Sequence, residues 1–150
     1  MTHKPAPPEG FVPSPTRPSS YNDLVGPFFE KREDGRISLG IYVEPRHCNA
    51  RGICHGGLLS SLADVGLGYS ALLGGAGHGA TGFVTVNLSL DFAGSARVGD
   101  WLETRAEVQK AGKTLAFVNG FVFASGKPIV RASAVFALSG TLAKKPPADG

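Results

Sequence analysis

The sequence predicts an α+β fold in which an antiparallel sheet of five to six strands wraps around one long central helix. One long apolar run, residues 56–73, has the periodicity of a helix. Four strand-like runs follow it, and the short gaps between them are typical of antiparallel neighbours. A chain of 150 residues corresponds to one domain that can bury a core of its own.

The predicted helix has two unlike faces when its residues are plotted at about 100° per residue. The large apolar face carries Leu58, Leu62, Val65, Tyr69, Leu72 and Leu73. The opposite face carries Gly57, Ser60, Ser61, Asp64, Gly68 and Ala71. Since a surface helix would carry long polar side chains there, we expect the large face to pack on the sheet. The small face is expected to be approached closely by a ligand or another chain.

Strands are predicted where apolar residues alternate with polar or small ones between turn signals. The predicted strands cover residues 37–43, 83–92, 101–110, 114–124 and 128–138, and the charged segment 31–35 is predicted to be a turn. A glycine-rich connection, residues 74–82, follows the helix. In the strand over 83–92, the alternation places Val84, Val86, Leu88, Leu90 and Phe92 on one face and Thr85 on the polar face.

The two ends of the chain differ in composition from the middle. Residues 1–20 contain six prolines and no apolar signal-peptide core, so they are predicted to be a disordered arm. Residues 21–140 are predicted to form the folded domain, and residues 141–150 a flexible tail.

Composition narrows the class of protein. A net charge of +3 is too diffuse for nucleic-acid binding but suits an anionic small molecule. No apolar run is expected to span a membrane, which needs about 18 residues. Two cysteines make no disulfide framework and indicate a reducing compartment. We therefore expect a cytoplasmic protein whose partners include neither nucleic acid nor membrane.

The chemistry-bearing residues cluster at the start of the helix and one side of it: Asn49, His55, Gly56, Gly57 and Asp64. The first backbone N–H groups of a helix lack partners and carry positive dipole character, and glycine leaves them open to a ligand. Such groups can hold a carbonyl oxygen as charge develops on it. Asp64 can serve as a nucleophile or general base. His55 is also a candidate catalytic residue, which either supports the adjacent amide or caps the helix and orders the loop.

Asp64 and Gly56 are too far apart to act together within one chain. Asp64 lies eight residues beyond Gly56, which is about 12 Å along a helix. If both act on one carbonyl, they must come from two copies of the protein. The sequence therefore predicts a dimer in which the small faces of two helices lie close to its axis.

Other site classes are disfavoured. His47, Cys48, Cys54 and His55 form two adjacent pairs without the spacing of a zinc site, so no metal is expected. The sequence has no Gly-x-Ser-x-Gly elbow of a serine hydrolase. The segment from Gly120 to Pro128 departs from a phosphate-binding loop in spacing and in its last residue.

The motif Asn-x-x-Gly-x-x-His-Gly-Gly-x₆-Asp over residues 49–64, with Val-Gly-Asp at 98–100 and Ala-Gly-Lys-Thr-Leu at 111–115, resembles a known family. It is similar to the hotdog-fold acyl-CoA thioesterases of the phenylacetate-pathway-like branch, the 4-hydroxybenzoyl-CoA thioesterase family. The resemblance covers roughly residues 28–138, and the glycine-rich connection departs from it in length.

The resemblance implies hydrolysis of an acyl- or aryl-CoA thioester without a cofactor. Asp64 would attack or activate water, and the Gly56 amide, helped by Asn49, would polarise the carbonyl. Thr85 would orient the water, and the site would draw on both subunits of a dimer that commonly pairs into a tetramer. The candidate substrate-binding residues are Gly57, Ser61, Arg97, Lys110 and Lys113. Two alternatives stay open: a hotdog enoyl-CoA hydratase or dehydratase using His55 and Asp64, and a non-catalytic acyl-CoA-binding protein.

Overall fold

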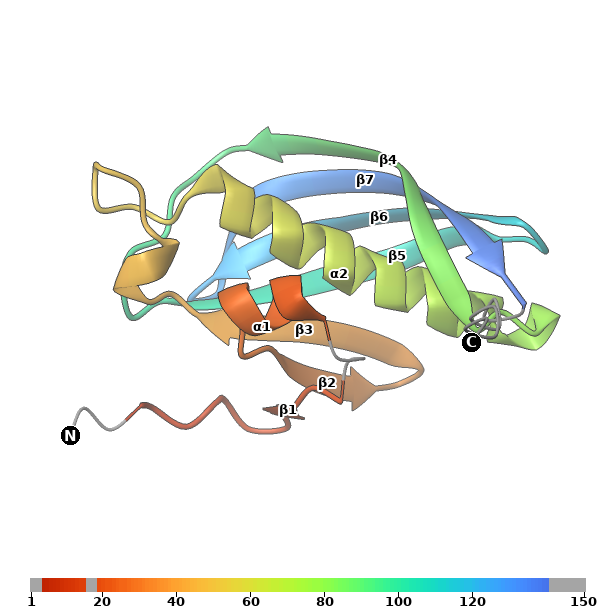
Figure 1. Ribbon diagram of the computed structural model, residues 1–150, viewed down its shortest axis with the longest axis horizontal. Coiled ribbons are helices and arrows are strands. Elements are labelled where there is room, and N and C mark those ends of the chain that lie inside the picture. The colour runs from red at the N-terminus through yellow and green to blue at the C-terminus, as the bar shows by residue number, and fades with distance from the viewer. Residues whose placement is uncertain (1–3, 16–18, 141–150) are drawn as a thin grey trace, which may run out of the picture.

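An antiparallel sheet curves around one long helix in the computed structural model, which describes residues 4–15 and 19–140 (Figure 1). The strands are β1 (Val12–Pro13), β2 (Phe29–Glu33), β3 (Arg36–Tyr42), β4 (Gly82–Phe92), β5 (Trp101–Ala111), β6 (Leu115–Ala124) and β7 (Lys127–Ser139). The helices are α1 (Ser20–Val25), α2 (Gly56–Gly75) and the short 3₁₀ turns η1 (Pro45–His47) and η2 (Ala76–His78). The strand order is β1-β2-β3-β5-β6-β7-β4, so β4 forms one edge.

The predicted central helix and the five predicted strands are confirmed with small shifts of their ends. The sheet has seven strands rather than five to six, because two strands precede β3 instead of none or one. The predicted charged turn over residues 31–35 is wrong: Lys31 to Glu33 belong to β2. Only Asp34 and Gly35, both with positive φ, form the turn. Charged side chains fit β2 because they are paired: Lys31 pairs with the exposed Glu33, and Arg32 pairs with the buried Glu30.

Part of the predicted disordered arm is built into the sheet. Val12 and Pro13 pair with Glu30 and Phe29 of β2. The preceding Phe11 is 9% exposed and meets the Trp101 ring edge-on, with centroids 4.9 Å apart. This apolar contact with the sheet orders residues that were predicted to be disordered because of their proline content. Residues 1–3 and 16–18, and the predicted tail at 141–150, lie outside the described residues.

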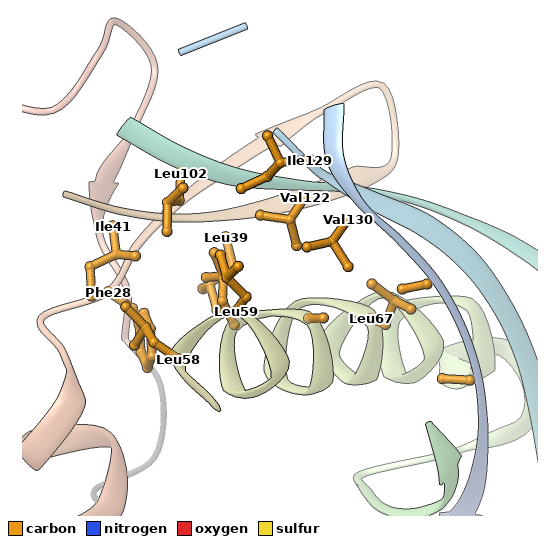
Figure 2. Close-up of a cluster of buried hydrophobic side chains, with 14 of the residues drawn as sticks. Phe28, Leu39, Ile41, Leu58, Leu59, Leu67, Leu102, Val122, Ile129 and Val130 are labelled. Carbon is orange, nitrogen blue, oxygen red and sulfur yellow. The ribbon is translucent and has the colours of Figure 1, made fainter. Parts of the chain in front are cut away.

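Helix α2 lies across the concave face of the sheet, and its leucines supply much of the core. Figure 2 shows Leu58, Leu59 and Leu67 among strand side chains such as Leu39, Leu102 and Val122. By length and composition α2 could span a membrane, contrary to expectation, but half of it is buried inside the fold. That burial is the behaviour of a core helix.

Only the N-terminal part of the predicted large-residue face of α2 meets the sheet as expected: Leu58 and Leu62 are buried in the core. Val65, Tyr69 and Leu72 are only partly buried and Leu73 is exposed, whereas Ala63, Gly66, Ser70 and Ala71 are buried. The reason is the short separation between α2 and β5. A Cβ atom on Gly66 would lie 2.5 Å from Thr104 Oγ1, so only glycine fits there without a shift of its neighbours.

We expect Gly66→Ala to destabilise the fold by about 1–3 kcal/mol, because the added methyl overpacks the helix–sheet contact and outweighs the better helix propensity of alanine. Urea denaturation measures the change. In a Thr104→Ala background the cost of the same substitution should shrink, since two of the three clashing atoms belong to the removed groups. A gain in stability from Gly66→Ala would contradict the close approach.

Candidate active site

The N-terminus of α2 presents one free backbone donor. His55 is the N-cap, and its Nδ1 accepts a hydrogen bond from the Gly57 N–H at 2.8 Å, as the capping interpretation expects. Among the described residues, nothing accepts from the Gly56 N–H. A Cβ atom on Gly56 would meet only the Phe92 ring, at 3.5 Å. The Gly56 amide is therefore open to a ligand, while Gly57, also proposed to contact substrate, has its N–H engaged by the cap.

The loop before the helix is held by Asn49. Its Oδ1 accepts from the Arg51 N–H at 2.9 Å and the Ile53 N–H at 3.4 Å. Gly52 adopts φ +73°, a left-handed conformation that favours glycine. Since the side-chain oxygen is committed to the loop, only Nδ2 of Asn49 remains for a ligand.

The candidate carboxylate is held by the neighbouring strand. Thr85 Oγ1 of β4 donates to Asp64 Oδ1 of α2 at 2.7 Å. A β-bulge lies between Thr85 and Asn87 and changes the alternation of β4. Thr85 pairs with the fully buried Phe136 and faces α2, so the face assignment from simple alternation is wrong on this side of the bulge.

A second polar contact lies one turn before Asp64. Ser61 Oγ donates to the Gly57 carbonyl at 2.9 Å and lies 2.5 Å from the Tyr21 hydroxyl of α1. Tyr21 is 54% exposed, and its ring is therefore available to a molecule bound beside Ser61. Sequence reasoning missed Tyr21, because nothing in the sequence pairs it with a residue 40 positions away.

The hydrogen bonds that position α1 come from η1. Arg46 donates to the carbonyls of Leu24 and Gly26. His47 is buried, its Nδ1 accepts from the Glu44 N–H, and its Nε2 donates to the Val25 carbonyl. Burial lowers the pKa of His47, which keeps the imidazole neutral and suited to this arrangement. His47 is therefore a structural residue.

The three basic residues among the substrate-binding candidates, Arg97, Lys110 and Lys113, do not lie together in one chain. Arg97 forms an isolated antiparallel β-bridge with Ile53, which lies in the loop before α2 and close to the Gly56 amide. Lys110 and Lys113 lie at the other end of the sheet, near Gly74, whose Cβ would contact Val108 and Ala111. That end is about 27 Å of helix away from Gly56. The described residues contain no group of three or more His, Cys, Asp or Glu that could hold a metal ion.

We expect Thr85→Val to lower kcat for the thioester hydrolysis that the family resemblance implies roughly tenfold, because the carboxylate loses a hydrogen bond. Bonds to charged groups are worth about 1.5–3 kcal/mol, and this one lies at the low end of that range because Thr85 is exposed. Thr85→Ser keeps the hydroxyl and should restore most of the activity. Steady-state kinetics on both variants measure the effect. A rise in KM at constant kcat would instead place Thr85 in substrate binding.

Comparisons with known proteins identify the family of the chain. The model of the thioesterase superfamily matches residues 51–130. A candidate esterase of Pseudomonas aeruginosa is 44% identical over 132 residues, which cover 87% of this chain and 96% of that protein. Human acyl-coenzyme A thioesterase 13 is 38% identical over 85 residues, which cover 57% of this chain and 59% of that protein.

Solved structures show the same fold. The Escherichia coli PaaI protein from the phenylacetic acid degradation operon has a TM-score of 0.70 at 21% identity, covering 81% of this chain and 86% of that one. A hypothetical thioesterase protein of Streptococcus pneumoniae, solved with coenzyme A, has a TM-score of 0.64 at 21% identity and covers 76% and 90%. The sheet wrapped around α2 is thus the hotdog fold, and the chain belongs to the thioesterase superfamily.

Proposed function

We propose that this protein hydrolyses an acyl- or aryl-CoA thioester to the free acid and coenzyme A. The observation that carries the proposal is the Asp64 carboxylate, held by Thr85, on a helix whose first amide, Gly56, has no partner among the described residues. A carboxylate and an open amide donor are the two groups that hydrolysis of a thioester needs.

The proposed reaction begins with the thioester carbonyl oxygen at the Gly56 N–H, where the helix dipole stabilises developing negative charge. Asp64 then either removes a proton from the attacking water or attacks the carbonyl carbon itself. The hydroxyl of Thr85 orients the carboxylate or the water. The leaving thiol has a pKa near that of cysteine, about 8.5, so it departs as a thiolate without a general acid.

We propose that two copies share each site, because Asp64 and Gly56 of one chain are about 12 Å apart along α2. The edge strand β4 is the surface that suits such pairing: Val84 is 68% and Val86 60% exposed. An edge strand of this length and character is a template for a second chain. Two-fold pairing through β4 would continue the sheet and place two α2 helices side by side.

Pairing of dimers into a tetramer is also proposed. The outer face of β6 carries Leu115, Phe117 and Phe121, each at least 40% exposed, which is an unusual concentration of apolar surface for a monomer. Mass measurement in solution distinguishes monomer, dimer and tetramer. A fully active monomer would contradict the shared site.

Coenzyme A is the proposed carrier of the acyl group. The Streptococcus structure that shares the fold holds coenzyme A. Arg97 lies beside the loop that leads to Gly56, and in a dimer the Lys110 and Lys113 of another chain could approach the same phosphates. A further basic residue, Arg131, is less suited to bind the phosphates, since Asp91 already pairs with it at 2.8 Å. The two free thiols favour a cytoplasmic location.

The test is a panel of phenylacetyl-, hydroxybenzoyl-, short-chain and long-chain CoA esters, with thiol release measured by a chromogenic disulfide reagent. We expect hydrolysis of at least one class. Enoyl-CoA absorbance, followed in parallel, detects the hydratase alternative. The cap bond disfavours that alternative, because Nδ1 of His55 accepts the Gly57 N–H and the neutral imidazole therefore carries its proton on Nε2, which cannot act as a base. Tight binding without turnover across the panel would instead indicate an acyl-CoA-binding protein.

A further inference from the structure

The two cysteines of the chain lie directly opposite each other where the loop before α2 closes. Cys48 and Cys54 form an isolated antiparallel bridge. The flanking hydrogen bonds run from the Asn49 N–H to the Ile53 carbonyl at 2.9 Å and from the His55 N–H to the His47 carbonyl at 2.8 Å. These bonds lie on either side of the cysteine pair and do not join it. Cys48 and Cys54 therefore occupy a non-hydrogen-bonded position, in which side chains lie closest.

That position has the backbone geometry of a disulfide. Opposed Cα atoms at a non-hydrogen-bonded site are about 4.5 Å apart, and disulfides form at Cα separations of roughly 4.4–6.8 Å. Both thiols are free, and each makes only a weak contact, from Cys48 to the Glu44 carbonyl at 3.7 Å and from Cys54 to the His55 carbonyl at 3.9 Å. Rotation about χ1 would release both contacts without moving the backbone.

We propose that Cys48 and Cys54 form a dithiol modification site, which a low-molecular-weight disulfide oxidises to an intramolecular disulfide. The Cys48 thiolate attacks one sulfur of the small disulfide, forms a mixed disulfide and expels one small thiolate. The Cys54 thiolate then attacks Cys48 Sγ and expels the second. Two small thiols take up the two protons and two electrons that the protein loses, so the step balances.

The order of attack follows from exposure. Cys48 is partly exposed, whereas Cys54 is 4% exposed, so a reagent in solvent meets Cys48 first. Burial raises the pKa of the Cys54 thiol to about 12, which makes ring closure the slow step. The closed ring encloses residues 49–53 and ends next to His55, the N-cap of α2. Oxidation would therefore lock the segment that leads into the helix N-terminus.

The test uses the purified, reduced protein in millimolar oxidised glutathione, quenched with an alkylating reagent and analysed by mass. We expect two alkylated cysteines before oxidation and none afterwards, with no glutathione retained. Trypsin cleaves at Arg51, between the two cysteines, so peptides 47–51 and 52–97 should stay joined until reduction. The oxidised protein should melt about 5 °C higher, because the cross-link restricts the unfolded chain, and the shift should reverse with reductant.

Two control variants distinguish formation of the intramolecular disulfide from reaction of a single thiol. Cys48→Ser should stay unreacted, and Cys54→Ala should retain one glutathione on Cys48. Neither should show the rise in melting temperature. A stable mixed disulfide on wild-type protein, a disulfide between two chains, or oxidation seen only after unfolding would each overturn the proposal. These readouts do not involve thioester hydrolysis, so the inference stands or fails independently of the proposed function.

Discussion

Replacing Asp64 with Asn is expected to lower kcat for thioester hydrolysis by about 10²- to 10⁴-fold, the range typical of removing a general base. Asparagine has nearly the same shape and can still accept the Thr85 hydroxyl through its own Oδ1. It can neither take a proton from water nor attack a carbonyl carbon. Turnover measured on the best substrate of the CoA panel, with KM determined in parallel, gives the effect.

The matched control is Asp91→Asn. Asp91 lies on the same chain at the surface of β4, where its carboxylate pairs with Arg131 rather than with α2. This substitution should leave kcat unchanged, because a surface ion pair contributes little to stability and Asp91 faces away from the proposed site. Thermal melting of both variants should match the wild type. Full activity in a folded Asp64→Asn protein would remove Asp64 from the mechanism.

Long, regular features of this fold could be predicted from the sequence, whereas irregular ones could not. The period of α2 and the turns between β5, β6 and β7 are local signals, so their residue ranges were confirmed. β1 and β2 were not predicted, because proline and charged residues are usually typical of loops. In the fold, Phe11 packs against Trp101. These residues lie far apart in the sequence, so a short stretch of sequence cannot show the contact.

The candidate site likewise combines features that the sequence predicts with features that only the fold reveals. The cap by His55 and the open Gly56 amide follow from the helix start, which the sequence shows directly. The contact of Thr85 with Asp64 depends on the bulge beside Val86, since strict alternation would put Thr85 on the wrong face. The separation of Lys110 and Lys113 from Gly56 depends on the length of α2 and on the direction of β5, which only the assembled fold reveals.

Replacing Gly56 with Pro is expected to lower kcat by about 10²- to 10³-fold, as loss of one oxyanion donor does. Proline removes only the N–H that the mechanism uses, and it is well suited to the first position of a helix. The residue before a proline must be extended, and His55 already is, with φ −65° and ψ 136°. Gly56→Ala is the matched control: it keeps the N–H, and its Cβ meets Phe92 at an ordinary 3.5 Å. Equal activity in the proline and alanine variants would exclude the amide from the reaction.

The two inactive variants together test whether each site is shared between chains. When Asp64→Asn and Gly56→Pro proteins are mixed and allowed to exchange subunits, half of the dimers contain one of each. If Asp64 of one chain serves Gly56 of the other, each mixed dimer has one intact site, and activity should return to about a quarter of the wild-type value. If both groups act within one chain, every site keeps a defect and activity stays absent even though native mass measurement shows exchange. Because the 12 Å along α2 forbids the second arrangement, recovery is the result that the helix geometry requires.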